Sequence, residues 1–160
     1  RYGMKHTISL IVENKFGVLA RIAGLFSARG YNISSLAVSE TLDPTISYMT
    51  IVVDARDEKI LEQINKQLNK LIDVITVTDF TKKQHVDREL ILVKVHCSPK
   101  DKESLAGVLE QYVAKSICRR DDTVIIEAVG DQEQIKKLLA ALHKFGVKEL
   151  TRSGRLAIAY

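Results

Sequence analysis

Cysteine is scarce in this sequence of 160 residues, and its scarcity excludes two kinds of small protein. Cys97 and Cys118 are too few for a disulfide framework and too few for a closed zinc site. Together with His96 they could hold a transition metal only if their strands are neighbours. We favour buried thiols in a reducing compartment and expect no metal site.

Long hydrophobic runs are also missing. No apolar run approaches the roughly 20 residues that a membrane-spanning helix needs, and the first residues lack the apolar segment and cleavage site of a signal peptide. We therefore expect a soluble, cytoplasmic protein with no membrane partner. The sequence begins with Arg rather than Met, so we assign no function to residues 1–3.

Recognisable catalytic motifs are absent as well. The four histidines are scattered, and the sequence contains no HExxH, no GxSxG and no GxxxxGK[ST]. Helices are expected to alternate with strands, which disfavours a helix-turn-helix protein. The missing acid–base cluster argues against an enzyme, although a catalyst built on a small α+β fold stays an alternative.

Charge is distributed unevenly between the two halves of the chain. Residues 1–80 contain nine Lys or Arg and nine Asp or Glu, whereas residues 81–160 contain fifteen and eleven, which gives the net charge of +4. The first half therefore suits a neutral or zwitterionic partner. The basic pairs of the second half alternate with acids such as Asp121 and Asp122, which is typical of a solvated surface. An amino-acid-responsive, nucleic-acid-binding protein remains an alternative hypothesis.

Hydrophobic spacing predicts the same order of elements in both halves. In the first half we expect strands at 5–13, 32–40, 45–54 and 73–80, and helices at 18–30 and 57–71. In the second half we expect strands at 90–96, 116–120 and 123–129, helices from Pro99 and Asp131, and short β runs at 147–151 and 156–160.

The order β-α-β-β-α-β is that of the ferredoxin-like fold, an antiparallel sheet with both helices on one face. We therefore predict an α+β protein with two such domains, at 1–80 and 90–160, joined by a polar linker at 81–89. The strand at 45–54 is apolar on both faces, so we expect a partner to cover the second face or an edge of the sheet. The sequence thus favours an oligomer.

The turn after the first strand is the first candidate binding site. Here unpaired backbone N–H groups and the helix dipole favour a carboxylate. Gly17 would allow a close approach, and the amide of Asn14 can accept from an ammonium group or donate to a carboxylate. An ordinary helix start would explain the same residues.

Asn32 provides a second candidate, because Asn is depleted in strands. Its amide could complete a polar pocket opposite the turn of a neighbouring subunit. An asparagine that bonds its own backbone is the simpler alternative.

Several stretches resemble a known family. The run SLIVENKFGVLARIAGLFSARGYNISSLAV is similar to the opening of ACT domains, and more closely to the small regulatory subunit of acetolactate synthase (acetohydroxyacid synthase). DPTISYMTIVV, KILEQINKQLNKLIDVITV and HVDRELILVKV match that subunit too, and the similarity continues more loosely to RSGRLAIAY.

The resemblance implies a non-catalytic subunit that binds valine between paired ACT domains, in a homodimer. The family's contact motif falls here on six residues: Asn14, Gly17, Val18, Leu19, Asn32 and Ile33. Val18, Leu19 and Ile33 would form an apolar wall for the ligand, and residues 15 and 16 belong to the loop.

The resemblance also implies a partner, the catalytic large subunit. The small subunit would activate it and confer feedback inhibition in branched-chain amino-acid biosynthesis, with valine and isoleucine among the products. We expect no cofactor in this chain, and thiamine diphosphate, Mg and FAD on the large subunit. The domain at 90–160 is expected to help contact that subunit, and no nucleic acid is expected.

Overall fold

A computed structural model describes residues 4–160, so the residues to which no function was assigned, 1–3, lie outside the described part. The chain forms two compact units. The first unit runs up to Asp87 and includes Arg155–Tyr160, and the second unit comprises Arg88–Gly154.

These units differ from the predicted domains in two places. Strand β5 (His85–His96) begins inside the polar segment that was predicted to be a linker at 81–89. The last six residues, predicted to belong to the domain at 90–160, are part of the first unit. Local polarity does not reveal either feature, because polar side chains also occupy exposed strands, and the partner of a strand is chosen by tertiary contacts.

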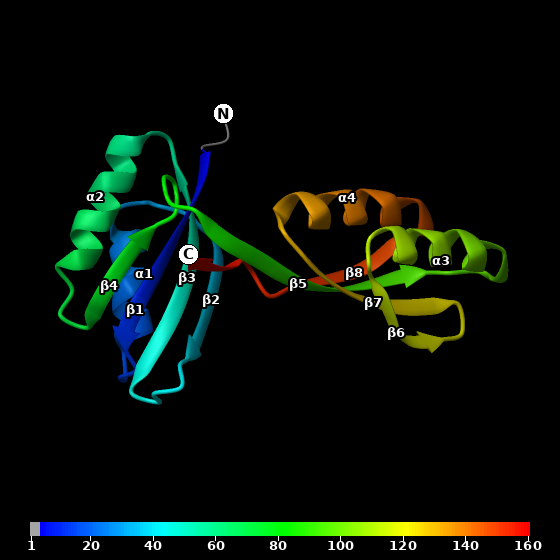
Figure 1. Ribbon diagram of the computed structural model, residues 1–160, viewed down its shortest axis with the longest axis horizontal. Coiled ribbons are helices and arrows are strands. Elements are labelled where there is room, and N and C mark those ends of the chain that lie inside the picture. Colours follow the sequence, from blue (N-terminus) through cyan, green and yellow to red (C-terminus); the bar gives the residue numbers. More distant parts are fainter. Residues whose placement is uncertain (1–3) are drawn as a thin grey trace. The chain divides into compact units, whose positions relative to one another are not determined.

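The first unit has the predicted β-α-β-β-α-β order (Figure 1). Its elements are β1 (Met4–Glu13), α1 (Val18–Ala28), β2 (Ile33–Glu40), β3 (Ile46–Ala55), α2 (Glu58–Asn69) and β4 (Val74–Asp79). The strands pair antiparallel in the order β2-β3-β1-β4. This arrangement confirms the predicted fold class for this part of the chain.

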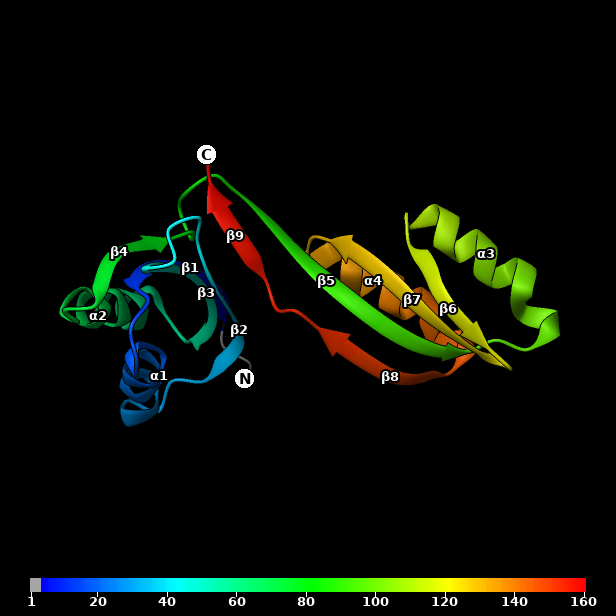
Figure 2. The same ribbon diagram turned by 90° about the horizontal axis from the view of Figure 1, so that it is seen from below.

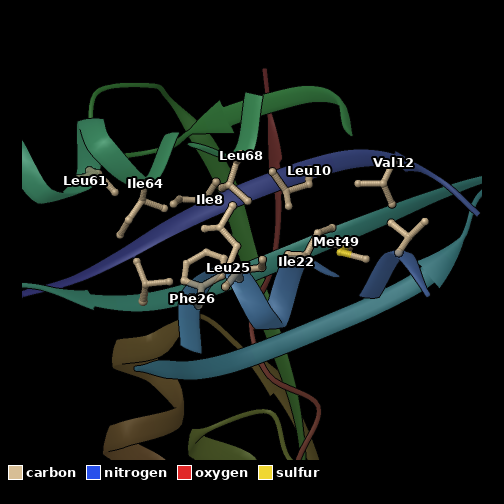
Figure 3. Close-up of a cluster of buried hydrophobic side chains, with 13 residues drawn as sticks. Ile8, Leu10, Val12, Ile22, Leu25, Phe26, Met49, Leu61, Ile64 and Leu68 are labelled. Carbon is tan, nitrogen blue, oxygen red and sulfur yellow. The ribbon is translucent and has the colours of Figure 1, made fainter. Parts of the chain in front are cut away.

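Alternation along β1 explains which face of this sheet carries the helices. Ile8, Leu10 and Val12 lie on one face and are at most 1% exposed. They pack against Ile22, Phe26 and other apolar residues of α1 and α2 in a single core (Figure 3). Burial of such side chains contributes about 1.5–3 kcal/mol each, so this core fixes both helices on one face.

The second unit repeats the arrangement (Figure 1). After β5 come a short 3₁₀ turn η1 (Pro99–Asp101), α3 (Lys102–Gln111), β6 (Lys115–Arg120), β7 (Thr123–Gly130), α4 (Gln132–Leu142), η2 (His143–Phe145) and β8 (Val147–Arg152). The strand order is β6-β7-β5-β8, and the final strand β9 (Leu156–Ala159) pairs with β5. Apolar residues of α3 and α4 form one core with the inner faces of β5 and β7.

None of the helices within residues 4–160 has the length and apolar character needed to cross a bilayer.

Candidate functional site

The turn between β1 and α1 is held by two other segments of the first unit. Glu13 N–H donates to the carbonyl of Asp73 at 2.9 Å, and Asn14 N–H donates to the carbonyl of Thr45 at 2.7 Å. The end of β1, the start of β3 and the residue before β4 therefore meet at one end of the sheet. A turn fixed on both sides presents its groups in a defined geometry.

Gly17 occupies a position that only glycine adopts without strain. Its φ of 81° is left-handed, and it forms the N-cap of α1. A Cβ built there would lie 3.1 Å from Nη1 of Arg21. Arg21 is itself fixed, because its Nε and Nη2 donate to Oδ2 of Asp73 at 3.0 and 2.6 Å. Space beside Gly17 is thus bounded by a guanidinium group.

Four backbone N–H groups at this turn have no acceptor within residues 4–160: those of Phe16, Gly17, Leu19 and Ala20. No side chain in the described part of the chain caps α1, and the first turn of this helix contains no acidic residue. Other helices are closed by their own side chains, for example α4 by a capping box. The start of α1 is therefore an open, positively polarised helix end of the kind that binds carboxylates.

Asn14 contributes an acceptor to the same turn. Its side-chain Nδ2 donates to the carbonyl of Pro44 at 2.8 Å, which fixes the amide and leaves Oδ1 to accept a hydrogen bond. An amide oxygen can accept from an ammonium group, so the turn offers donors for a carboxylate and an acceptor for an amine.

Asn32 lies just before β2 and pairs with Asp54. Its carbonyl accepts from Asp54 N–H at 3.1 Å, and its Nδ2 donates to Oδ2 of Asp54 at 3.0 Å. This bond from Asn32 is the main reason that the pKa of the Asp54 carboxyl lies below its usual value. Asn32 is thus oriented by a side chain rather than by its own backbone.

One chain does not bring Asn32 to the turn at Asn14. Glu13 is paired with Ile46 at the start of β3, whereas Ile33 is paired with Val53 near its end. Seven residues along a strand correspond to about 23 Å. The two predicted halves of the site therefore lie at opposite ends of the sheet, and only a second chain can bring them together.

The three predicted apolar contacts differ in exposure. Val18 is 3% exposed and is part of the core, so its side chain does not reach a ligand at the surface. The place of Val18 in an apolar wall stays a prediction, and helix periodicity puts its side chain on the face that packs against the sheet. Leu19 is 44% exposed, and Ile33 is half-buried at the edge of the core.

Sequence reasoning did not identify Arg21, Asp73, Pro44 and Thr45 as parts of this site. Asp73 and Thr45 are far from Gly17 in sequence and reach it only through strand pairing. No local pattern links them to the turn, and pairing of strands is decided by the whole sheet.

The cysteines give no sign of a metal centre in the described part of the chain. Cys97 is buried, Cys118 is exposed, and both are free thiols. Nη2 of Arg119 lies 3.8 Å from the sulfur of Cys97, and no group of three or more metal-binding side chains occurs among residues 4–160.

Comparison with known proteins extends these observations over the full chain. Residues 8–76 match the AHAS small subunit-like ACT domain, and residues 88–160 match the family described as the small subunit of acetolactate synthase. The chain is 44% identical over 155 residues to a probable acetolactate synthase small subunit of Archaeoglobus fulgidus, covering 97% of this chain and 96% of that protein. It is 40% identical to the acetolactate synthase small subunit of Bacillus subtilis, covering 98% and 91%.

A solved structure shows the same fold over both units. The crystal structure of the acetolactate synthase small subunit from Thermotoga maritima is 34% identical, with a TM-score of 0.87 and coverage of 98% of each chain. Each of these relatives is named as a small subunit of acetolactate synthase. This chain belongs to the family of acetolactate synthase small subunits, and its amino-terminal unit is an ACT domain.

Proposed function

We propose that this chain is the regulatory subunit of an acetolactate synthase, and that it binds valine or a similar branched-chain amino acid at a site shared by two copies. Binding there reduces the activity of the catalytic large subunit, which the ligand-free small subunit stimulates. The open start of α1 at Gly17, with its unpaired N–H groups, is the observation that supports this proposal most directly.

A free amino acid suits this turn better than a larger anion. The N–H groups around Gly17 can hold its carboxylate, and Oδ1 of Asn14 can accept from its ammonium group. Gly17 leaves room for only a small group, because Arg21 lies just beyond it. The exposed side chain of Leu19 supplies an apolar contact next to the same amides.

The second half of the site would come from Asn32 and Ile33 of another copy. β2 is an edge strand, and its backbone groups are open to pairing with a further strand. If two β2 strands pair antiparallel, Asn32 of one copy comes to the end of the sheet where the other copy carries Asn14. A homodimer of this kind is isologous and contains two equivalent sites.

Discrimination among aliphatic amino acids should be modest. One methylene more or less in an apolar pocket changes binding by roughly 1–3 kcal/mol. Valine, leucine and isoleucine are therefore expected to differ in affinity rather than in whether they bind.

The large subunit is the partner on which this regulation acts. We expect it to carry thiamine diphosphate, Mg and FAD, and we expect the second unit of this chain to take part in contacting it. The effector can change activity only if it binds two states of the assembly with different affinity, and a dimer interface that contains the ligand provides such a difference.

The substitution Gly17→Asp tests the proposal. Aspartate tolerates left-handed φ better than most residues, and its carboxylate would occupy the place of the ligand's carboxylate beside Arg21. We expect stimulation of the large subunit to persist, while valine binding by calorimetry falls at least about 100-fold, as expected when one carboxylate replaces another at a helix start.

Gly107→Asp is the matched control, because it adds the same charge at an exposed position of α3 where nothing lies within 4 Å of a new Cβ. This variant should respond to valine like the wild type. If Gly17→Asp keeps the wild-type response to valine, the site is not at this turn.

A further inference from the structure

The last six residues of the chain lie on the outer face of the first unit's sheet, opposite α1 and α2. We call Arg155–Tyr160 the terminal strap. Its backbone is held by side-chain hydroxyl groups: Tyr48 donates to the carbonyl of Ala157 at 2.7 Å, and Oγ of Ser35 accepts from Arg155 N–H at 3.0 Å. Oγ1 of Thr50 accepts from Ala157 N–H at 3.4 Å.

The low exposure of the residues beneath the strap shows that it covers this face of the sheet. Thr7, Ser9 and Thr50 alternate with the core residues of β1 and β3, so they point away from the helices, yet they are only 6%, 4% and 1% exposed. The apolar second face of β3, for which an external partner was expected, is thus covered at least in part by the chain's own end.

Polar contacts dominate this cover. Nη1 of Arg155 donates to Oγ1 of Thr7 at 2.7 Å, and Tyr160 N–H donates to the carbonyl of Gln84 at 3.4 Å. On the sheet of the first unit the strap is held by single hydroxyl bonds, each of which contributes little net free energy, whereas its strand ladder is with β5. The strap can therefore leave this sheet and return, still paired with β5, without unfolding the sheet beneath it.

The strap also connects the two units covalently. It follows β8 of the second unit through Gly154, whose φ is 81°, and Figure 2 shows it running beside the start of β5. Nε of Arg155 lies 3.3 Å from Oδ2 of Asp87, an ion pair in which both side chains are largely buried. The chain leaves the first unit after Asp87 and returns to it at Arg155. This ion pair therefore joins the two points at which the chain passes between the units.

The seat of the strap lies on the strands that carry the candidate effector turn. Thr7 is on β1, which ends at Glu13 beside the turn, and Tyr48 and Thr50 are on β3, whose preceding residue Thr45 accepts from Asn14. A shift of β1 against β3 at that end changes the spacing of the hydroxyl groups that hold the strap.

We propose that the terminal strap transmits effector occupancy from the first unit to the second. The strap does so by being bound to, or released from, its seat, the hydroxyl groups of Thr7, Ser35, Tyr48 and Thr50. This inference rests on the proposed function. The strap is a transmitting element and does not touch the ligand, so loss of its seat should alter the response to the effector and not its binding.

The test compares the full-length wild type with the double variant Tyr48→Phe/Thr50→Val, which removes two hydroxyl groups and preserves side-chain size. Tyr112→Phe, at the end of α3 in the second unit, is the matched control. Each protein is titrated with valine by calorimetry and is assayed with the large subunit for stimulation and for inhibition by valine. Hydrogen exchange of residues 155–160 is measured with and without valine.

We expect the double variant to bind valine within about threefold of the wild type and to stimulate the large subunit normally, while inhibition weakens about tenfold, within the usual range of coupling between sites. In the wild type, valine should change the exchange of the Arg155 and Ala157 amides, which donate to Ser35 and Thr50; in the variant, the Ala157 amide should exchange rapidly in both states. A chain that ends at Arg155 serves as the second variant and should behave in the same way.

Two outcomes would overturn the role of the strap while leaving the proposed function intact. One is unchanged inhibition in both variants, and the other is a loss of valine affinity as large as the loss of inhibition. If instead the wild type itself neither binds an aliphatic amino acid nor is inhibited by one, the proposed function fails, and the role of the strap fails with it.

Discussion

At the scale of single residues, Gly17 shows how one backbone conformation shapes a site. Gly17 ends the turn with a left-handed φ and carries no side chain, so the first amide N–H groups of α1 remain accessible. A residue with a Cβ would be strained there and would meet Nη1 of Arg21 at 3.1 Å. The same atom that would obstruct a side chain would supply positive charge close to the carboxylate of the proposed ligand.

This geometry predicts opposite effects for the same substitution at two glycines. Gly17→Ala should lower the free energy of unfolding by about 1 kcal/mol, the cost of a left-handed residue with a Cβ. Gly24→Ala, on an exposed position inside α1 with open space around it, should raise it by about 0.5–1 kcal/mol. Urea unfolding measures both. Equal effects of the two substitutions would mean that Gly17 is not constrained as described.

At the residue scale, local chemistry was sufficient to place the turn between β1 and α1. The glycine and the asparagine of the turn were identified from a strand that passes into a helix, and the structure gives both the positions expected. Val18 was assigned to the apolar wall from the family's contact motif, and its side chain belongs to the core, on the face of α1 that packs against the sheet. Arg21 was not identified because its fixed position depends on Asp73.

At the scale of elements, the helices differ in how their first turns are closed. Asp57 accepts from Ile60 N–H at 2.9 Å at the start of α2, and Asp131 accepts from Gln134 N–H at 2.8 Å at the start of α4. The start of α1 has no such group. Closed helix ends serve stability, and the open one is available for a ligand.

Removal of a cap should therefore be costly where no ligand is involved. Asp57→Ala should lower the free energy of unfolding of the first unit by about 1 kcal/mol, because a backbone N–H loses its acceptor. Glu62→Ala, on an exposed position of the same helix, should change it by less than about 0.5 kcal/mol. Thermal and urea unfolding give both values. A negligible effect at Asp57 would show that water replaces the cap at no cost.

Element order was predictable because hydrophobic spacing changes clearly between strands and helices. The pairing of elements was less predictable. β9 was recognised as a β run, but its contacts with the first unit depend on hydroxyl groups at Ser35, Tyr48 and Thr50, which read in the sequence only as ordinary strand residues.

At the scale of the whole molecule, Asn14 and Asn32 lie at opposite ends of the sheet, one beside the start of β3 and the other beside its end. The two halves of the proposed site lie at opposite ends of one sheet in a single chain, so that site would need two chains. In the proposed site, dimerisation is then part of binding and not merely of stability. Effector affinity should rise with protein concentration wherever the dimer dissociates.

Mixed dimers test this arrangement directly. Gly17→Asp and Asn32→Ala homodimers should each fail to bind valine, because every site in them contains one damaged half. After the two proteins exchange subunits, each mixed dimer has one site with both halves intact. Random mixing should recover about a quarter of a site per chain by calorimetry, given two equivalent sites per symmetric dimer. No recovery despite proven exchange would place both halves within one chain.

The sequence by itself determined the order of the elements, the two-fold repetition of the fold and the chemistry of the turn at Gly17, because each of these depends on residues that are near one another along the chain. The tertiary structure alone decided where the compact units divide, and that the last six residues lie on the sheet of the first unit. These features depend on contacts between residues far apart in sequence, and neither periodicity nor composition records which distant strands pair.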